Sequence, residues 1–147
     1  MPLLKSRPET FATKKNSAIK YLLPLEKDII KNVYGNDSEI PQTIYNHIQH
    51  NLNLGKKAYA ILKIKFKNGN SYWTKNIFEP KMTPNSNKNS FTIKTELSDI
   101  EKIATAKKLY KILNKIELAT NANLASKFLE GYLEEKCITF NEFTSLN

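Results

Sequence analysis

The sequence predicts an α+β fold, in which an antiparallel sheet is flanked by helices and followed by a C-terminal helical extension. Three stretches have the features of strands. The clearest of them, residues 59–66, alternates its side chains with the period of two that marks a half-buried strand. Three other stretches carry apolar residues at helical spacing. With 147 residues the chain is long enough to bury a substantial core, and we expect one domain with an appendage.

A hairpin over residues 58–79 is the best-defined predicted element. Asn68-Gly69 follows the first strand, and this dipeptide favours a two-residue type I′ turn. Such a turn places Ile64 opposite Trp73. It also places Lys75 on the core side, so we expect a bulge or the end of the sheet there. The predicted core side of the hairpin consists of Ala60, Leu62, Ile64, Phe66, Trp73 and Ile77.

The other elements follow from local signals. Pro41 suits the first turn of a helix. Ser98-Asp99-Ile100-Glu101 is a capping box at the start of the longest helix. The expected apolar stripe of that helix is Ile100, Ile103, Ala106, Tyr110, Leu113 and Ile116. We expect strands near 58–67, 71–79 and 89–95, and helices near 41–52, 99–117 and 123–135.

The sequence before the sheet is less regular. Residues 1–18 are polar and basic, and we interpret them as a mobile arm or a partner-contact segment. Pro24 divides the apolar stretch that follows, which leaves a short helix near 26–33. The chain therefore divides into an N-terminal arm and short helix at 1–33, a central domain at 34–117, and a C-terminal helix and tail at 118–147.

The net charge of +9 comes almost entirely from lysine, because Arg7 is the single arginine among 23 basic residues. Asparagine is also abundant, and an AT-rich coding sequence tends to give a chain with this composition. The charge therefore need not reflect a polyanionic partner, and we expect no nucleic acid as a partner. The alternative is a basic nucleic-acid-binding protein whose stacking platform consists of Lys63, Lys65, Lys67 and Tyr72.

Several function classes have no support in the sequence. There is no set of nucleophile, base and acid and no glycine-rich phosphate loop, so we expect no enzyme. His47 and His50 are three residues apart, but no further ligand is evident, so we expect no metal site. There is no apolar run of membrane-spanning length and no signal-peptide core. Together with the single cysteine, Cys137, this predicts a cytoplasmic protein without membrane insertion.

Several segments within residues 34–117 resemble one known family. They are Gly55-Lys56-Lys57 before the first strand, Lys67-Asn68-Gly69-Asn70-Ser71-Tyr72-Trp73 at the hairpin, Glu79-Pro80 at the end of the second strand, and Leu109-Tyr110-Lys111-Ile112-Leu113 in the long helix. In this order they resemble PAS domains of the aerotaxis-receptor type, which act in bacterial energy taxis. The resemblance implies a PAS-like antiparallel sheet. It also implies a signalling role in which the helix after the last strand moves, or partners exchange across the sheet.

PAS domains of this type hold FAD, so the resemblance raises the question of a cofactor. Here Asn36-Asp37 replaces the family's Arg-His, Gln49 replaces a tryptophan, Ala58-Tyr59-Ala60 replaces W-x-G, and Ile64 replaces an asparagine that faces the flavin. We therefore expect no flavin, haem or metal. The alternative is a flavin- or small-ligand-binding sensor with a pocket formed by Tyr45, Tyr59, Leu62, Ile64, Trp73 and Phe91.

The sequence thus favours a non-enzymatic cytoplasmic PAS signalling or adaptor protein, acting in energy taxis or chemotaxis through protein–protein contacts. We expect a homodimer or a heterodimer with a related PAS protein, and a membrane chemoreceptor as a further partner. The residues after Glu117 are more apolar than a solvated extension should be. A rival interpretation is that this tail folds back on its own sheet in a monomer. The expected interface comprises Ile103, Tyr110, Leu124, Phe128, Leu129 and Leu133.

Overall fold

The structure is a computed structural model that describes residues 30–31, 37–81 and 90–145. Its elements are α3 (Gln42–Asn53), β1 (Ala58–Lys65), β2 (Ser71–Lys81), β3 (Ser90–Leu97), α4 (Ile100–Ala119), α5 (Ala122–Glu135) and α6 (Phe140–Ser145). The predicted α+β class is confirmed, and the strands predicted near 58–67, 71–79 and 89–95 and the helices predicted near 41–52, 99–117 and 123–135 are present. The predicted arm at 1–18 lies outside the described residues, as do most of the predicted helix at 26–33 and residues 82–89 of the loop.

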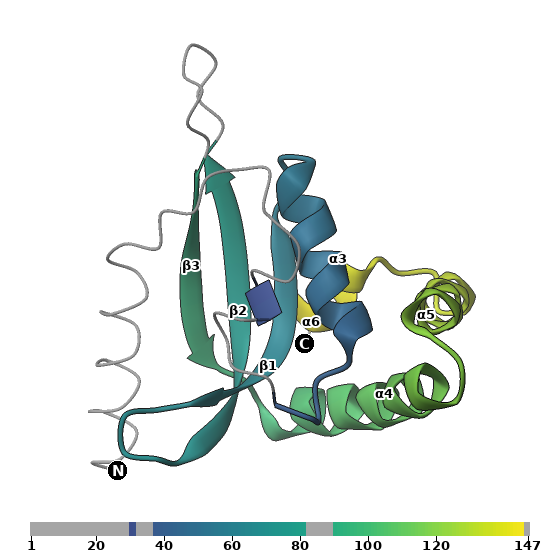
Figure 1. The fold of residues 1–147 in the computed structure, drawn as a ribbon. Helices are drawn as coiled ribbons and strands as arrows, with labels where there is room; N and C mark the ends of the chain where they lie inside the picture. The colour runs from purple at the N-terminus through teal and green to yellow at the C-terminus, as the bar shows by residue number, and fades with distance from the viewer. Residues whose placement is uncertain (1–29, 32–36, 82–89, 146–147) are drawn as a thin grey trace.

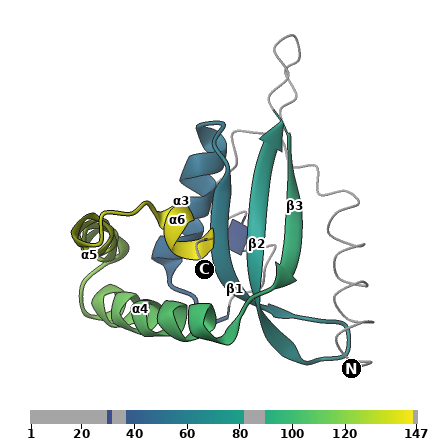
Figure 2. The same ribbon diagram turned by 180° about the vertical axis from the view of Figure 1, so that it is seen from behind.

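The three strands form one antiparallel sheet in the order β1-β2-β3. Helices α3 to α6 gather on the β1 side of the sheet, and β3 lies at the far edge (Figures 1 and 2). Both α3 and α6 pack against β1. The middle strand therefore has a neighbour on either side, whereas β1 has helices along its free edge.

The loop between β1 and β2 has one residue more than the sequence predicted. The amide of Phe66 donates to the carbonyl of Asn70 at 2.9 Å, and the amide of Gly69 donates back to Phe66 at 3.0 Å. Residues 67–69 thus form a three-residue loop, in which Gly69 has a φ of +88°. A type I turn followed by a left-handed glycine is the usual form of such a loop. The predicted two-residue turn is wrong by one residue.

That single residue reverses the faces of β2, because strand side chains alternate with a period of two. Trp73 lies opposite Lys63, not Ile64, and Tyr72 takes the place opposite Ile64. The predicted inward positions of Trp73 and Ile77 are therefore wrong. Lys75 lies opposite Ile61, so no bulge is needed to keep it out of the core.

We call the buried side of the sheet the inner face and the other side the outer face. The inner face carries Ala58, Ala60, Leu62 and Ile64 of β1, Tyr72, Thr74, Asn76 and Phe78 of β2, and Phe91, Ile93 and Thr95 of β3. The outer face carries Tyr59, Ile61, Lys63 and Lys65 of β1, Trp73, Lys75 and Ile77 of β2, and Thr92 and Lys94 of β3.

The inner face includes polar side chains that the predicted register had placed outside. Asn76 is fully buried, and its amide donates to the Thr74 hydroxyl at 3.0 Å and accepts from the Thr95 hydroxyl at 2.8 Å. The Thr74 hydroxyl in turn donates to the carbonyl of Leu62 at 3.2 Å. Buried polar groups must be hydrogen-bonded to avoid a large desolvation cost, and these meet that condition.

Helix α4 begins one residue later than its predicted cap. The N-cap is Asp99, whose carboxylate accepts from the amide of Lys102 at 2.7 Å, so the predicted Ser98 capping box is wrong. Ile100 was expected in the apolar stripe, but it is 84% exposed. The side chains of α4 that are buried are Ala106, Leu109, Tyr110 and Leu113.

The C-terminal tail contains a helix that the sequence interpretation did not include. Helix α5 ends in a Schellman motif, with the amide of Ile138 donating to Leu133 and Cys137 in the left-handed region at a φ of 57°. Helix α6 then starts with a reciprocal capping box. The Thr139 amide donates to the Glu142 carboxylate at 2.8 Å, and the Glu142 amide donates to the Thr139 hydroxyl at 3.1 Å.

Helix α6 packs against β1 and covers part of its free edge. The Asn141 side chain accepts from the amide of Tyr59 at 3.2 Å and donates to the carbonyl of Lys57 at 3.1 Å. Phe140 and Phe143 are buried in the main core. The last segment of the tail, α6, therefore folds back onto the sheet, which agrees with that part of the rival interpretation.

Candidate functional site

A groove lies on the outer face, where the turn at residues 37–39, strand β2 and helix α4 meet. Its volume is about 570 Å³. We call it the Trp73 groove, after the aromatic side chain that β2 contributes. Its lining consists of Ser38, Glu39, Trp73, Ala104, Lys107, Lys108, Lys111 and Asn114.

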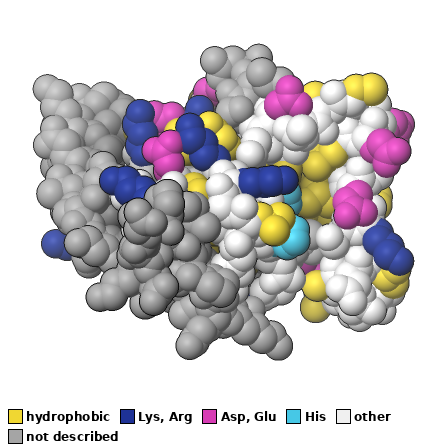
Figure 3. Space-filling model, turned by 90° about the horizontal axis from the view of Figure 1, so that it is seen from above, with side chains coloured by type: hydrophobic (Ala, Val, Ile, Leu, Met, Phe, Trp, Pro, Cys, Tyr) yellow, Lys and Arg dark blue, Asp and Glu magenta, His cyan; other side chains and the backbone are white. Residues whose placement is uncertain are grey.

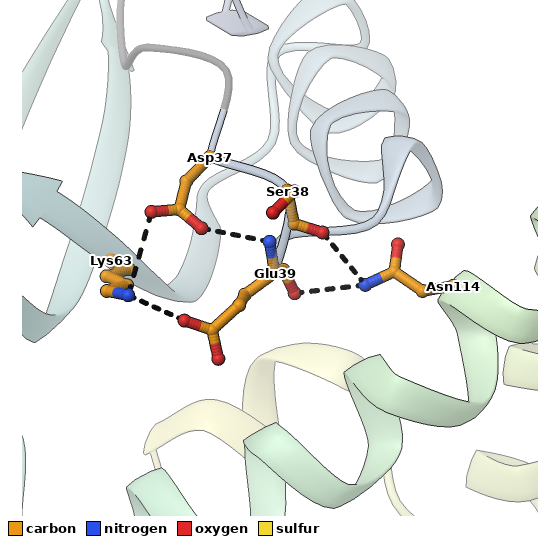
Figure 4. Close-up of polar contacts among 5 residues, drawn as sticks. All are labelled: Asp37, Ser38, Glu39, Lys63 and Asn114. Atoms are coloured by element: carbon orange, nitrogen blue, oxygen red, sulfur yellow. Dashed lines mark hydrogen bonds and ion pairs between the residues drawn. The ribbon is translucent and has the colours of Figure 1, made fainter.

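One wall of the groove is a turn held by side chains from two elements (Figure 4). Lys63 of β1 lies 2.6 Å from the carboxylate of Glu39 and 3.8 Å from that of Asp37. Asn114 of α4 donates to the carbonyls of Ser38 and Glu39, both at 3.2 Å. The hydrogen bond to Glu39 raises the pKa of Lys63, although burial opposes the shift. The turn is thus fixed to both the sheet and α4.

Trp73 forms the aromatic part of the groove. Its side chain is half-buried, and its ring centroid lies 6.3 Å from that of Tyr110. Tyr110 is held in turn, because its hydroxyl donates to the carbonyl of Ile61 at 2.7 Å and it is 1% exposed. Burial raises the pKa of Tyr110 far above its usual range, so the phenol remains protonated as a donor. The indole therefore lies against a fixed support.

The opposite wall is a row of lysines on α4. Lys107, Lys108 and Lys111 are exposed, and the Lys107 ammonium lies 5.9 Å from the Trp73 ring centroid. Residues three and four apart lie on one side of a helix, which brings Lys107 and Lys111 together. Among the residues that the structure describes, no carboxylate pairs with any of these three lysines.

The same helix caps the start of α3. Helix α3 has Pro41 at its N-cap and no side-chain cap of its own. The Glu117 carboxylate of α4 accepts from the amide of Gln42 at 3.0 Å, from the amide of Thr43 at 2.7 Å and from the Thr43 hydroxyl at 2.5 Å. A carboxylate there satisfies free amides and favours the positive end of the helix dipole. Helix α4 is therefore tied to α3 as well as to the groove.

The residues predicted to form a cofactor pocket do not share one face of the sheet. Tyr45, Leu62, Ile64 and Phe91 are buried in the main core cluster. Tyr59 and Trp73 lie on the outer face and are half-buried. The structure thus separates the six into a core group and an outer pair.

The residues predicted for a partner interface also divide into accessible and inaccessible ones. Leu124 and Phe128 of α5 are 45% and 38% exposed. Tyr110 and Leu129 are buried within the chain, at 1% and 3% exposure. Ile103 and Leu133 are half-buried.

His47 and His50 lie on α3 as predicted, and His47 is half-buried whereas His50 is exposed. The His47 ring centroid lies 4.5 Å from that of Phe140 in α6, in an edge-on arrangement. Burial, and secondarily the nearby His50, lowers the pKa of His47 to about 4. Within the described parts of the chain, no group of three His, Cys, Asp or Glu side chains is placed to hold a metal ion.

The predicted nucleic-acid platform is not assembled as expected. Lys63 and Lys65 lie on the outer face, whereas Tyr72 lies on the inner face with its ring 4.9 Å from Phe66. The aromatic residue beside Lys63 is Trp73 instead. Seen from above, basic and acidic side chains are interspersed (Figure 3).

Sequence reasoning missed the α4 lysines as site residues. The wrong register had placed Trp73 in the core, which left those lysines without an aromatic neighbour. The available signal was their spacing of three and four residues on a helix that follows the last strand.

Comparison with models of known protein families finds no match, and comparison with curated proteins finds none either. None of the helices in the described residues has the length and apolar character needed to cross a bilayer.

Proposed function

We propose that this chain is a non-enzymatic cytoplasmic signalling or adaptor protein of the PAS type, acting in energy taxis or chemotaxis through protein–protein contacts. The segments between residues 34 and 117 that resemble aerotaxis-type PAS domains support the proposal. The direct connection of the last strand, β3, to a long helix, α4, suits a signal that leaves through that helix.

The observation that carries the proposal is the distribution of exposed apolar side chains. In the described residues, those on the α4–α5 helical hairpin are Ile112, Leu118, Leu124 and Phe128, at 41%, 89%, 45% and 38% exposure. Ile100, at the start of α4, is exposed as well. Of the seven large hydrophobic side chains that are exposed in the described residues, five belong to α4 or α5, and an excess of exposed apolar side chains favours a contact region. We assign partner binding to this hairpin.

The contacts of α4 provide a route from such a partner to the rest of the chain. Glu117 links α4 to the start of α3, and Asn114 links it to the turn at residues 37–39. A partner that displaced α4 would break both links together. The proposed partners are a second copy, a related PAS protein, and a membrane chemoreceptor.

Light scattering tests the self-association part of this proposal. The full chain is expected to be dimeric at tens of micromolar, and Leu124→Glu with Phe128→Glu should make it monomeric, because charges would replace exposed apolar contacts. Leu54→Glu is the matched control, since Leu54 is 56% exposed and lies beyond the end of α3. A monomeric full chain, or equal effects of both changes, would contradict the assignment to α5.

The cofactor expectation has its own test. We propose that the protein carries no flavin, haem or metal, and that the apolar side chains around Tyr45, Leu62 and Phe91 act as core. An absorbance spectrum of the purified chain should show only the protein band. Stoichiometric flavin released on heating would instead support the sensor alternative.

A further inference from the structure

We propose that the Trp73 groove binds a small organic anion with a planar ring, of the chemical class of a nucleoside phosphate. The ring would lie against Trp73, and the phosphates would contact the lysines of α4. The proposal does not depend on the adaptor role, since the groove is separate from the exposed Leu124 and Phe128.

The size of the groove suits one such molecule. Small-molecule sites typically enclose about 300–1,000 Å³ and combine apolar walls with a few convergent polar groups. The Trp73 groove has a volume of about 570 Å³. Ala104 contributes a small apolar side chain to the α4 wall, and the turn at residues 37–39 closes one side.

The aromatic surface is already positioned. Trp73 is half-buried against Tyr110, whose hydroxyl is fixed to the backbone of β1 at 2.7 Å. A stacking ligand therefore would not have to order a mobile ring, which lowers the entropic cost of binding. The Lys107 ammonium lies over the indole at 5.9 Å from its centroid, so a stacking ring would take its place and the displaced ammonium would remain near enough to contact an attached phosphate.

Three lysines with no carboxylate partner among the described residues line this groove. On the sheet, Lys57 pairs with Glu79 at 3.1 Å and Lys75 pairs with Glu96 at 3.4 Å. Lys63 is likewise neutralised by the turn residues. Lys107, Lys108 and Lys111 pair with no carboxylate in the described residues. Glu39, the one carboxylate in the lining, is already engaged at 2.6 Å by Lys63.

The same charges favour a single small ligand over a nucleic-acid strand. A strand-binding surface needs successive aromatic platforms and a continuous basic track. Here Trp73 stands alone as the aromatic residue of the groove, and the neighbouring lysines Lys63 and Lys75 are paired with acids. The two lysines beside Trp73 on the sheet therefore offer a strand little free charge.

Trp73 is the only tryptophan of the chain, so its fluorescence reports on this site alone. The full chain is titrated with ADP, adenosine and tripolyphosphate, and calorimetry gives each Kd independently. ADP is expected to quench Trp73 fluorescence with a Kd below about one millimolar. Adenosine and tripolyphosphate should each have a Kd at least about tenfold higher than that of ADP, since each lacks one half of the contacts. No ADP binding, or equal binding of tripolyphosphate, would overturn the proposal.

Matched variants locate the site. Lys107→Gln with Lys111→Gln should weaken ADP by about tenfold. Lys115→Gln with Lys127→Gln removes the same charge outside the groove lining, so it should change Kd by less than about twofold. Circular dichroism confirms that both variants fold. Equal weakening by the two pairs would show non-specific attraction and overturn the site. An oligothymidine that binds far more tightly than ADP would also overturn it, in favour of nucleic acid.

Discussion

Trp73 and Phe78 lie on opposite faces of β2, and truncating each one measures what its face contributes to stability. Phe78 is fully buried on the inner face, so Phe78→Ala should lower the free energy of unfolding by about 3–5 kcal/mol. Trp73 is half-buried on the outer face, and Trp73→Ala should cost about 1–2 kcal/mol. Urea denaturation followed by circular dichroism gives both values. A Trp73→Ala loss as large as that of Phe78→Ala would support the two-residue turn instead.

Cys137 is the one described non-glycine residue with a positive φ, and its conformation makes it a target for stabilisation. At a φ of 57° a Cβ is unfavourable, whereas glycine adopts this region freely. Cys137→Gly should raise the free energy of unfolding by about 0.5–1 kcal/mol. Cys137→Ala removes the thiol but keeps the Cβ, so it should leave stability nearly unchanged. Equal stabilisation by both would attribute the effect to the thiol.

At the scale of elements, the link between α4 and α3 depends on one carboxylate. Glu117→Ala leaves the amides of Gln42 and Thr43 without their acceptor and should cost about 1–2 kcal/mol. Glu117→Gln keeps one acceptor oxygen and should cost less. Glu130→Gln on α5 is the control. Because Glu130 is exposed, this substitution should change the free energy of unfolding by less than about 0.5 kcal/mol. Thermal unfolding ranks the three variants by stability. If Glu117→Ala lowered stability no more than Glu130→Gln does, the cap would be contradicted.

Capping signals show what the sequence could and could not predict about these elements. The pattern Thr-x-x-Glu at 139–142 forms a true capping box and would have predicted α6. The matching pattern at 98–101 does not, because Asp99 itself caps the helix through the amide of Lys102. Ser98 and Asp99 are adjacent and either side chain could cap the helix, so the sequence pattern alone does not show which of them does. Strand and helix positions were nonetheless predicted well, since their periodicity spans many residues.

At the scale of the whole molecule, the features that sequence reasoning missed come from distant parts of the chain. Asn141 covers the edge of β1 through Tyr59, 82 residues away. The Trp73 groove combines a turn, a strand and a helix. Its existence also depended on the length of one loop, since the one-residue difference at Gly69 decides which way Trp73 faces. Both loop types accept glycine there, so the local sequence Lys-Asn-Gly-Asn did not separate them.

The packing of α6 against α3 makes the stability of the whole chain depend on pH. His47 is packed against Phe140, and its amide neighbour Asn51 lies 3.4 Å from the ring. Burial lowers the pKa of His47 to about 4, below the value of about 6.5 that the unfolded chain should have. The unfolded state therefore binds more protons between these values. The contribution of neutral His47 to the free energy of unfolding should therefore be complete above pH ~6.5, and about 2–3 kcal/mol of it should be lost as the pH drops to ~4.

Substitution separates His47 from the carboxylates that also titrate in acid. His47→Gln cannot take up the proton, so its urea-denaturation free energy should change less between pH ~6.5 and ~4.5 than that of the unmodified chain. His50→Gln leaves the ring of His47 against Phe140 and should keep most of the slope. Both variants retain the same carboxylates, which therefore contribute equally to the two curves. An unchanged slope in His47→Gln would show that protonation of this ring does not control the attachment of α6 to α3.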